Sequence, residues 1–333
     1  MYPDIPLWIS SLFIVVGLAA LAWSADAFIA SASKIAHALG ISPFVIGMIV
    51  IGFGTSAPEL CVSALSGLAG HSDLSLGNAY GSDIFNIACI LGLTVFIRPL
   101  VVKPAIVYVA APALVAISLF SCLLVGLGNG FSRLDGILEL VVFAVLLPLY
   151  CWFDQQTKGV VKDPALSGGR PVDRSHMLRA WIMLVVGLVV LIGSSHVLVW
   201  GSVDLARILG VSELLIGLTI VAVGTSLPEL AAAIASARQG EHEFVLGNII
   251  GSNFFNTLAV VGIAGSISPF RNVSPYILWR DMPMMVALSL SMALFGFNWR
   301  KPREAGVYSR KVGALWLLVF VGYMCLMITQ ELR

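Results

Sequence analysis

Two carboxylates stand in apolar stretches at matching places in this sequence. Glu59 closes the string GTSAPE, and Glu229 closes the string GTSLPE. Thr55 and Ser56 precede Glu59 by four and three residues, so a helix would place both hydroxyls on the face of the carboxylate. Carboxylate and hydroxyl oxygens are ligands of hard cations such as Ca²⁺. Ionisable groups inside apolar spans are costly and usually functional.

The prolines of the same strings predict a break in each helix. Pro58 has no N–H to donate, so the carbonyl of Gly54 loses its helical partner. Glycines at 52 and 54 loosen the same turn. Pro228 stands in the same place in the second string. We therefore expect two broken helices that offer free carbonyl oxygens beside the carboxylates.

The two strings belong to a longer duplication. Residues 39–94 and 209–264 align without a gap, and 21 of the 56 paired positions are identical. A second pair of strings, LGNAYGSDIFN and LGNIIGSNFFN, lies in the same blocks. The shared oxygen-bearing residues form the predicted cation site: Thr55, Ser56, Glu59, Ser82, Asn86, Thr225, Ser226, Glu229, Ser252 and Asn256. Gly77, Gly81, Gly247 and Gly251 are expected to serve close packing of helices.

Composition indicates an integral membrane protein. The 333 residues are 59% hydrophobic and only 11% charged, whereas soluble domains carry about 25% charged residues. A net charge of +1 gives no basic surface for nucleic acid. Five cysteines are scattered singly in apolar segments and lack the spacing of a metal site. Apolar runs this long can only be helices in a bilayer, so we expect an all-α membrane protein.

Hydropathy predicts ten membrane-spanning helices, and basic residues predict their orientation. The spans are 7–30, 42–69, 74–97, 104–127, 134–153, 178–206, 212–237, 244–268, 275–297 and 311–330. Of the 19 Lys and Arg residues, 14 fall in the loops of one side, which we expect to be cytoplasmic. Both termini would then lie outside. The chain divides into a first half at 1–153, a cytoplasmic linker at 154–177 and a second half at 178–333.

The two halves are expected to be inverted relative to each other. Each half holds five spans, an odd number, so the second half must insert upside down. Inverted repeats with polar centres are typical of secondary transporters. The inversion would bring both motifs together near the membrane midplane, in a site lined only by oxygen.

Other function classes fit the residues less well. A passive cation channel usually builds its filter from several identical subunits, whereas one chain here supplies both halves of the site. A membrane-embedded enzyme could use paired glutamates, but no nucleophile, metal-binding histidine or phosphate-binding loop accompanies them. We therefore expect no enzymatic activity and no cofactor. The partners expected are inorganic cations and the lipid bilayer, and a monomer should suffice.

The paired motifs of the duplicated blocks resemble those of a known protein family. GTSAPEL with GNAYGSDIFN, and GTSLPEL with GNIIGSNFFN, look like the two alpha-repeats of sodium/calcium exchangers of the calcium/cation antiporter superfamily. The short linker is similar to that of prokaryotic members, which implies the plasma membrane, the inner membrane of a prokaryote. The resemblance implies Na⁺/Ca²⁺ exchange by alternating access, in which the first and sixth helices slide across the site.

The resemblance also implies roles for single residues. Glu59 and Glu229 would bridge calcium and sodium sites, and the shared threonines, serines and asparagines would add oxygens. The backbone carbonyls of Gly52 and Ala222 are further candidates.

Two positions depart from the family pattern. The family often has Asp where this chain has Asn256, and Asn where it has Asp83. Asp83 either supplies charge from a displaced position or faces a cavity without coordinating. A Ca²⁺/H⁺ or Na⁺/H⁺ antiporter is therefore the alternative. Outside the repeats, Glu139 in the fifth span is expected to have a packing or loop-facing role.

Overall fold

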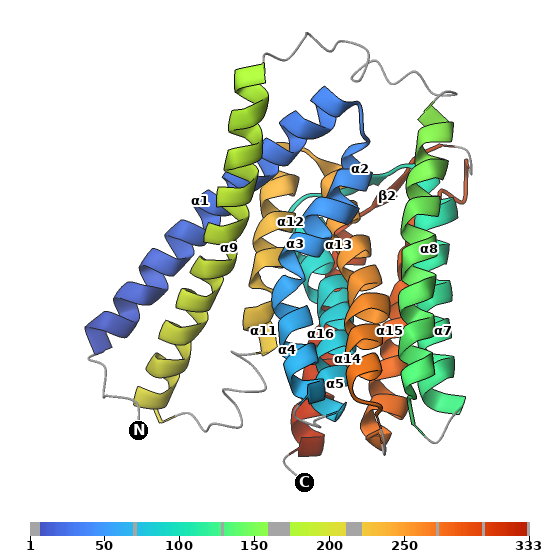
Figure 1. Ribbon diagram of the computed structural model, residues 1–333. Helices are drawn as coiled ribbons and strands as arrows, with labels where there is room; N and C mark the ends of the chain where they lie inside the picture. Colours follow the sequence, from blue (N-terminus) through green and yellow to red (C-terminus); the bar gives the residue numbers. More distant parts are fainter. Residues whose placement is uncertain are drawn as a thin grey trace.

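The structure is a computed structural model that describes residues 7–68, 72–127, 130–158, 174–210, 222–270, 273–301 and 304–331. Nearly all of these residues are helical, as expected (Figure 1). Among the described residues, eight helices are long and apolar enough to cross a membrane, and one bent pair makes a ninth. Part of the predicted span 212–237 lies outside the described residues. The rest of that span forms α11 (Ala222–Thr225) and most of α12 (Leu227–Gln239).

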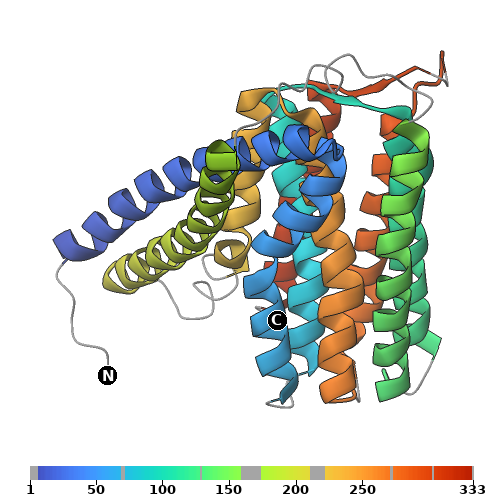
Figure 2. The same cartoon turned by 45° about the horizontal axis from the view of Figure 1, so that its top comes forward.

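Two predicted spans are longer than hydropathy indicated. Helix α1 (Leu7–Leu39) has 33 residues and α9 (Arg174–Ile208) has 35. At 1.5 Å per residue each is about 50 Å long, which exceeds a hydrocarbon core of about 30 Å. The two helices lie side by side and lean away from the other helices, which stand nearly parallel (Figures 1 and 2). A strong tilt therefore accommodates the extra length.

Glycines bring α1 and α9 into close contact. A Cβ atom on Gly17 would lie 3.0 Å from the backbone nitrogen of Leu198, and one on Gly187 would lie 3.1 Å from the Cα of Phe28. Small residues allow two backbones to approach in a membrane, where packing replaces the hydrophobic effect as the main attraction. The pair therefore forms a unit of its own beside the bundle.

The remaining helices form a bundle around the two repeats. The first repeat contains α2 (Pro43–Ile46), the wide π-helical turns of η1 (Gly47–Gly52), α3 (Phe53–Thr55) and α4 (Ala57–Leu68). The next span consists of α5 (Ser72–Ile84), η2 (Phe85–Leu91) and α6 (Gly92–Ile97). In the second repeat its counterpart consists of α13 (His242–Phe254), η5 (Phe255–Val260) and α14 (Val261–Ile267). The π-helical segments η2 and η5 begin at paired positions of the two repeats, so the duplication extends to local backbone form.

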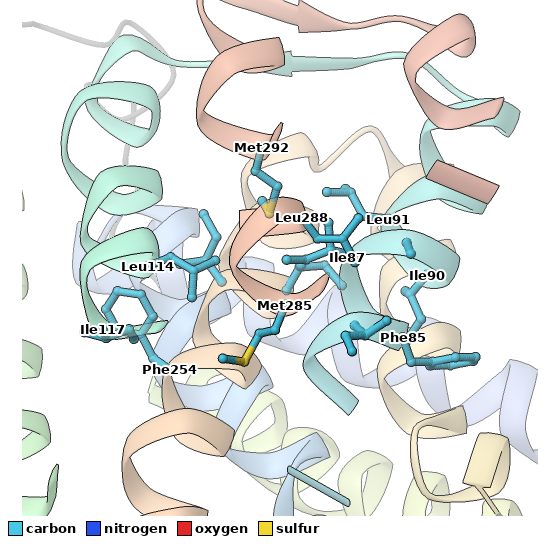
Figure 3. Close-up of a cluster of buried hydrophobic side chains, with 14 of the residues drawn as sticks. Phe85, Ile87, Ile90, Leu91, Leu114, Ile117, Phe254, Met285, Leu288 and Met292 are labelled. Carbon is cyan, nitrogen blue, oxygen red and sulfur yellow. The ribbon is translucent and has the colours of Figure 1, made fainter. Parts of the chain in front are cut away.

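Four further spans surround the repeats. They are η3 with α7 (Ile106–Ala110 and Ala111–Leu127), α8 (Arg133–Lys158), η6 with α15 (Ile277–Asp281 and Met282–Gly296) and α16 (Arg310–Glu331). Residues 154–158 and 174–177 of the predicted linker continue α8 and α9, and 159–173 lie outside the described residues. In Figure 3, Met285 and Leu288 of α15 lie between Ile87 of η2 and Leu114 of α7. All four side chains are buried, so the outer spans complete the apolar core of the bundle.

A short pair of strands joins the two halves. Strand β1 (Leu100–Val102) pairs antiparallel with β2 (Gly306–Tyr308), with Val101 opposite Val307. Three-residue strands in loops carry no readable sequence pattern, and none was expected here. In Figure 1, α1 begins and α16 ends at the end of the molecule away from these strands.

The helix crossing between the repeats depends on glycine. A Cβ atom on Gly247 would lie 2.4 Å from the carbonyl oxygen of Phe44, and one on Gly251 would lie 2.4 Å from that of Met48. Thus α13 touches the first repeat backbone to backbone, which confirms the expected packing role of these two glycines. The duplication predicts that Gly77 and Gly81 face residues 214 and 218, which lie outside the described residues.

We expect Gly251→Ala to destabilise the protein. The added methyl group would push against the Met48 backbone, which cannot rotate away, and overpacking of this kind costs about 1–3 kcal/mol. Thermal unfolding of purified protein in detergent would measure the loss. Gly322→Ala in α16 is the control, because no described atom lies within 4 Å of its Cβ position. Equal melting temperatures for the two variants would contradict the backbone contact.

Candidate cation site

Both repeats break their helix at the same serine. The helix formed by Pro43–Thr55 bends by 48° before Ala57–Leu68, and the residue at the break, Ser56, has φ −83° and ψ 4°. Ser226, between α11 and α12, has φ −94° and ψ 12°. The break predicted from the two prolines is confirmed. Each break points a serine hydroxyl out of the helix one turn before a glutamate.

The two breaks meet in space and exchange hydrogen bonds. Ser56 Oγ donates to Glu229 Oε1 at 3.2 Å, and Ser226 Oγ donates to Glu59 Oε1 at 3.1 Å. Each serine therefore holds the glutamate of the opposite repeat. This reciprocity is what a two-fold relation between inverted repeats requires, and it brings together four of the residues predicted for the site.

Each glutamate keeps one oxygen without a hydrogen-bond partner. Glu59 is 0% exposed and Glu229 is 1% exposed, and the Oε2 atom of each has no hydrogen bond. No Lys, Arg or His is buried among the described residues. A bare carboxylate away from water is strongly unfavourable unless a positive charge joins it. The two free oxygens fit the chemistry of a bound cation.

Two buried asparagines predicted for the site lie in the π-helical segments, Asn86 in η2 and Asn256 in η5. The end groups of Asn86 and Asn253 are 2.9 Å apart, which joins η2 to α13. Asn256 is 0% exposed, and both its amide oxygen and its amide nitrogen lack hydrogen bonds. Buried amides are normally satisfied. Asn256 is therefore a further polar group that fits an ion or water.

Thr55 and Ser252 each contact a backbone carbonyl just before the break of the first repeat. Thr55 Oγ1 donates to the Ile51 carbonyl at 3.0 Å, as a threonine inside a helix often does. Ser252 Oγ lies 3.4 Å from the Gly52 carbonyl, which also accepts the Ser56 N–H at 3.0 Å. The remaining positions are buried Ser82 in α5, half-buried Thr225, and Ala222, of which only the backbone is described.

Asp83 belongs to this polar cluster and bonds across the repeats. Its side chain is 1% exposed, and its Oδ2 accepts the Thr257 hydroxyl at 2.7 Å. When the Asn253 amide is turned to satisfy its neighbours, its nitrogen lies 3.3 Å from Asp83 Oδ1. Asp83 is thus connected through Asn253 to Asn86.

In the described residues, no group of three Asp, Glu, His or Cys side chains is close enough to hold a metal alone. An ion held in this cluster therefore needs the hydroxyl, amide or carbonyl oxygens as well.

Two asparagines that were not predicted for the site support the glutamates. Asn78 Nδ2 donates to the Glu59 carbonyl at 3.2 Å, and Asn248 Nδ2 donates to the Glu229 carbonyl at 3.3 Å. Asn248 Oδ1 also lies 3.3 Å from the Thr55 hydroxyl, which places the second repeat in contact with the first. The signal was available, because both residues follow an identical Leu-Gly pair in the two blocks.

We expect Asn248→Leu to weaken cation binding. The change removes the amide hydrogen bond to the Glu229 carbonyl and the contact with Thr55 of the opposite repeat. One hydrogen bond contributes about 0.5–1.5 kcal/mol, so the apparent Ca²⁺ affinity should fall roughly 3–10-fold. Calcium titration of the purified variant and of the unchanged protein measures this, with Gly322→Ala as the control, and an unchanged affinity in Asn248→Leu would exclude the supporting role of this amide.

Comparisons with known proteins agree with this geometry. The family model described as sodium/calcium exchanger protein matches residues 9–152 and 179–329. The chain is 38% identical to the putative antiporter CaxA of Alkalimonas amylolytica, over 97% of this chain and 99% of that protein. It is 34% identical to inner membrane protein YrbG of Escherichia coli K12, over 96% and 97%. It is 30% identical to sodium/calcium exchanger MaX1 of Methanosarcina acetivorans, over 90% and 95%.

Solved structures show the same fold. The sodium-calcium exchanger NCX_Mj soaked with zero Na⁺ and Ca²⁺ superposes with a TM-score of 0.80 at 27% identity, over 98% of this chain and 100% of that one. The same exchanger soaked with 10 mM Na⁺ and zero Ca²⁺ gives a TM-score of 0.79 at 26% identity, over 97% and 99%. The fold class expected from the sequence, ten helices in two inverted repeats, is confirmed. With two buried glutamates held across the repeats and a family match along nearly all of its length, the chain belongs to the sodium/calcium exchanger protein family.

Proposed function

We propose that this protein is a secondary-active antiporter that exchanges Na⁺ for Ca²⁺ through the cluster around Glu59 and Glu229. The observation that carries the proposal is the pair of buried carboxylates, each with an unpartnered oxygen and no buried basic residue beside it. Membership of the sodium/calcium exchanger family and the named exchanger among its relatives support the choice of ions.

The chemistry of the cluster suits both ions. Ca²⁺ and Na⁺ bind oxygen ligands, and every polar side chain gathered here presents oxygen. Two carboxylates balance the charge of one Ca²⁺ or of two Na⁺. Because a doubly negative, empty site is unfavourable in a dry interior, the release of one ion favours the entry of another. This coupling is the physical basis of exchange.

The α1–α9 pair provides a part that can move. Its two helices pack mainly on each other, and polar contacts connect them to the bundle at separate points. Ser33 Oγ of α1 donates to Glu241 Oε1 at 2.8 Å, and Ser195 Oγ of α9 donates to the Gly224 carbonyl at 3.0 Å. The second contact lies one residue before Thr225. We propose that the pair slides along the bundle and opens the cluster to each side in turn.

The proposal also includes an orientation. Fourteen of the 19 basic residues fall in the alternate predicted loops that include residues 98–103 and 300–311, and basic loops remain in the cytoplasm. Both termini would therefore lie outside the plasma membrane, the inner membrane if the cell has two. One chain contains both halves of the site, so we propose that a monomer transports ions without further partners and without catalysis.

We expect Glu59→Gln and Glu229→Gln each to abolish coupled transport. Removal of one partner from a buried charged contact costs about 3 kcal/mol, which is roughly a 100-fold loss of ion affinity. Vesicles loaded with Na⁺ and diluted into sodium-free medium should take up ⁴⁵Ca²⁺ with the unchanged protein but not with either variant. Glu304→Gln is the matched control, because that carboxylate is 61% exposed in an ion pair with Lys301.

The same vesicles discriminate between mechanisms. Uptake driven by a pH gradient instead of a sodium gradient would show that protons are the coupling ions. Uptake that needs neither gradient would show a channel. Full uptake by Glu59→Gln or Glu229→Gln would show that the ion binds elsewhere.

For Asp83 we propose a supporting role rather than direct coordination. Its carboxylate accepts a hydrogen bond from the Thr257 hydroxyl and lies beside the Asn253 amide. Asn253 in turn contacts Asn86. The buried charge would then fix the amides that face the ion. The position across the pseudo-two-fold axis has Asn253, so the two repeats differ in charge here.

We expect Asp83→Asn, which makes this position alike in both repeats, to keep exchange. The amide side chain can still accept the Thr257 hydroxyl, so the half-saturating Ca²⁺ concentration should rise less than about tenfold. Initial rates of ⁴⁵Ca²⁺ uptake over a range of Ca²⁺ concentrations measure this half-saturating concentration. A loss as large as that of Glu59→Gln would make Asp83 a ligand in its own right.

A further inference from the structure

Glu139 is a buried carboxylate that the cation site does not use. It lies in α8, outside both repeats, and its side chain is 0% exposed. The sequence predicted a packing or loop-facing role in the fifth span. The structure instead places the carboxylate at the end of a hydrogen-bonded chain that crosses three helices.

The chain runs from Tyr80 in α5 through Ser121 in α7 to Glu139. Ser121 Oγ donates to Glu139 Oε1 at 2.7 Å, and the Tyr80 hydroxyl is 2.7 Å from Ser121 Oγ. A hydroxyl has one hydrogen. Since Ser121 gives its hydrogen to the carboxylate, Tyr80 is the donor to Ser121. Both hydrogen bonds therefore point toward Glu139, and all three side chains are buried.

The charge of Glu139 has no positive partner in the structure described. Its Oε2 atom makes no hydrogen bond. Helix α14 and the π-helical η5, which pack against α8, carry no ionisable residue. The ionisable groups near it are Tyr80, Cys122 of α7 and Asp135 on α8 itself, and none of them can carry a positive charge.

We propose that Glu139 is an accessory site for one monovalent positive charge, a proton or Na⁺, held by its carboxylate with the Ser121 hydroxyl beside it. One carboxylate balances one positive charge, whereas Ca²⁺ would leave an excess charge in an apolar region. The site is distinct from the transport cluster, because the hydrogen bond of Glu139 goes to Ser121, which is not among the residues placed there.

The accessory site is linked to the transport cluster through α5. Tyr80 is two residues before Ser82 and six before Asn86, so its bond to Ser121 fixes the helix that carries both. The position that corresponds to Tyr80 in the second repeat is Ile250, which has no hydroxyl. The chain is therefore present in the first half only, and only α5 is coupled to this charge.

Unfolding as a function of pH and Na⁺ tests the proposal. A carboxyl group of an unfolded chain ionises near pH 4. If the folded protein keeps a proton on Glu139, unfolding above that pH releases it, so stability falls as pH rises. The unfolding equilibrium constant then rises by an extra factor of about ten per pH unit, and this part is lost in Glu139→Gln. Glu304→Gln, at an exposed carboxylate, should behave like the unchanged protein.

The experiment compares melting curves of purified protein from about pH 6 to about pH 9, with either choline chloride or NaCl as the salt. A pH response that Glu139→Gln lacks, the same in both salts, identifies a proton. A stabilisation by NaCl at constant pH that Glu139→Gln lacks identifies Na⁺. Identical responses of Glu139→Gln and the unchanged protein would overturn the proposal.

A second variant keeps the test decisive if Glu139→Gln does not fold. Ser121→Ala retains the carboxylate and removes its hydrogen-bond donor, so the bare charge becomes less favourable and the positive charge is held more tightly. The pH at which the fall in stability ends should then move upward, or less Na⁺ should suffice. Responses unchanged in Ser121→Ala would also overturn the proposal. Sodium-driven ⁴⁵Ca²⁺ uptake should persist in Glu139→Gln, because the transport cluster is intact.

Discussion

Negative charge without a basic partner is the constraint that organises this protein. Four carboxylates, those of Glu59, Asp83, Glu139 and Glu229, are buried without a basic partner in the part of the chain that the structure describes, and no Lys, Arg or His is buried there. The contrast is Asp281, also buried, which binds Arg280 at 2.6 Å and accepts the Tyr323 hydroxyl. Burial of an unpaired charge costs several kcal/mol even after relaxation. Asp281 thus has a permanent partner within the protein, whereas the four unpaired carboxylates are left for a cation or a proton that binds and dissociates.

The backbone is shaped to bring these charges together. Glycines at 247 and 251 let α13 touch the first repeat directly. That close crossing brings Ser56 and Ser226, each at a helix break, within reach of the opposite glutamate. A bulky residue at the crossing would separate the repeats and with them the two carboxylates. The small residues and the acidic residues of the duplicated block are thus parts of one arrangement.

Much of this arrangement could be predicted from the sequence, because membrane helices leave few choices. Glu59, Glu229 and the prolines beside them stood out against apolar surroundings, and the structure confirms the helix breaks and the meeting of the repeats. The supporting roles of Asn78 and Asn248 were missed, because a backbone carbonyl as acceptor leaves no mark in a sequence. The length of α1 and α9 was underestimated, because polar residues continue a helix beyond its apolar part. The bond from Asp83 to Thr257 depends on the relative rotation of two distant helices, which periodicity does not give.

The pairing of β1 with β2 has a consequence for how the molecule divides. One strand comes from each half, so the pairing connects the bundle helices of the two halves to each other. The helices proposed to slide, α1 and α9, also come one from each half. The boundary between the sliding pair and the bundle therefore does not coincide with the boundary between the two halves of the chain. Each half contributes one helix to the sliding pair and several to the bundle. Neither half alone contains a complete sliding pair or a complete bundle, so each half depends on the other.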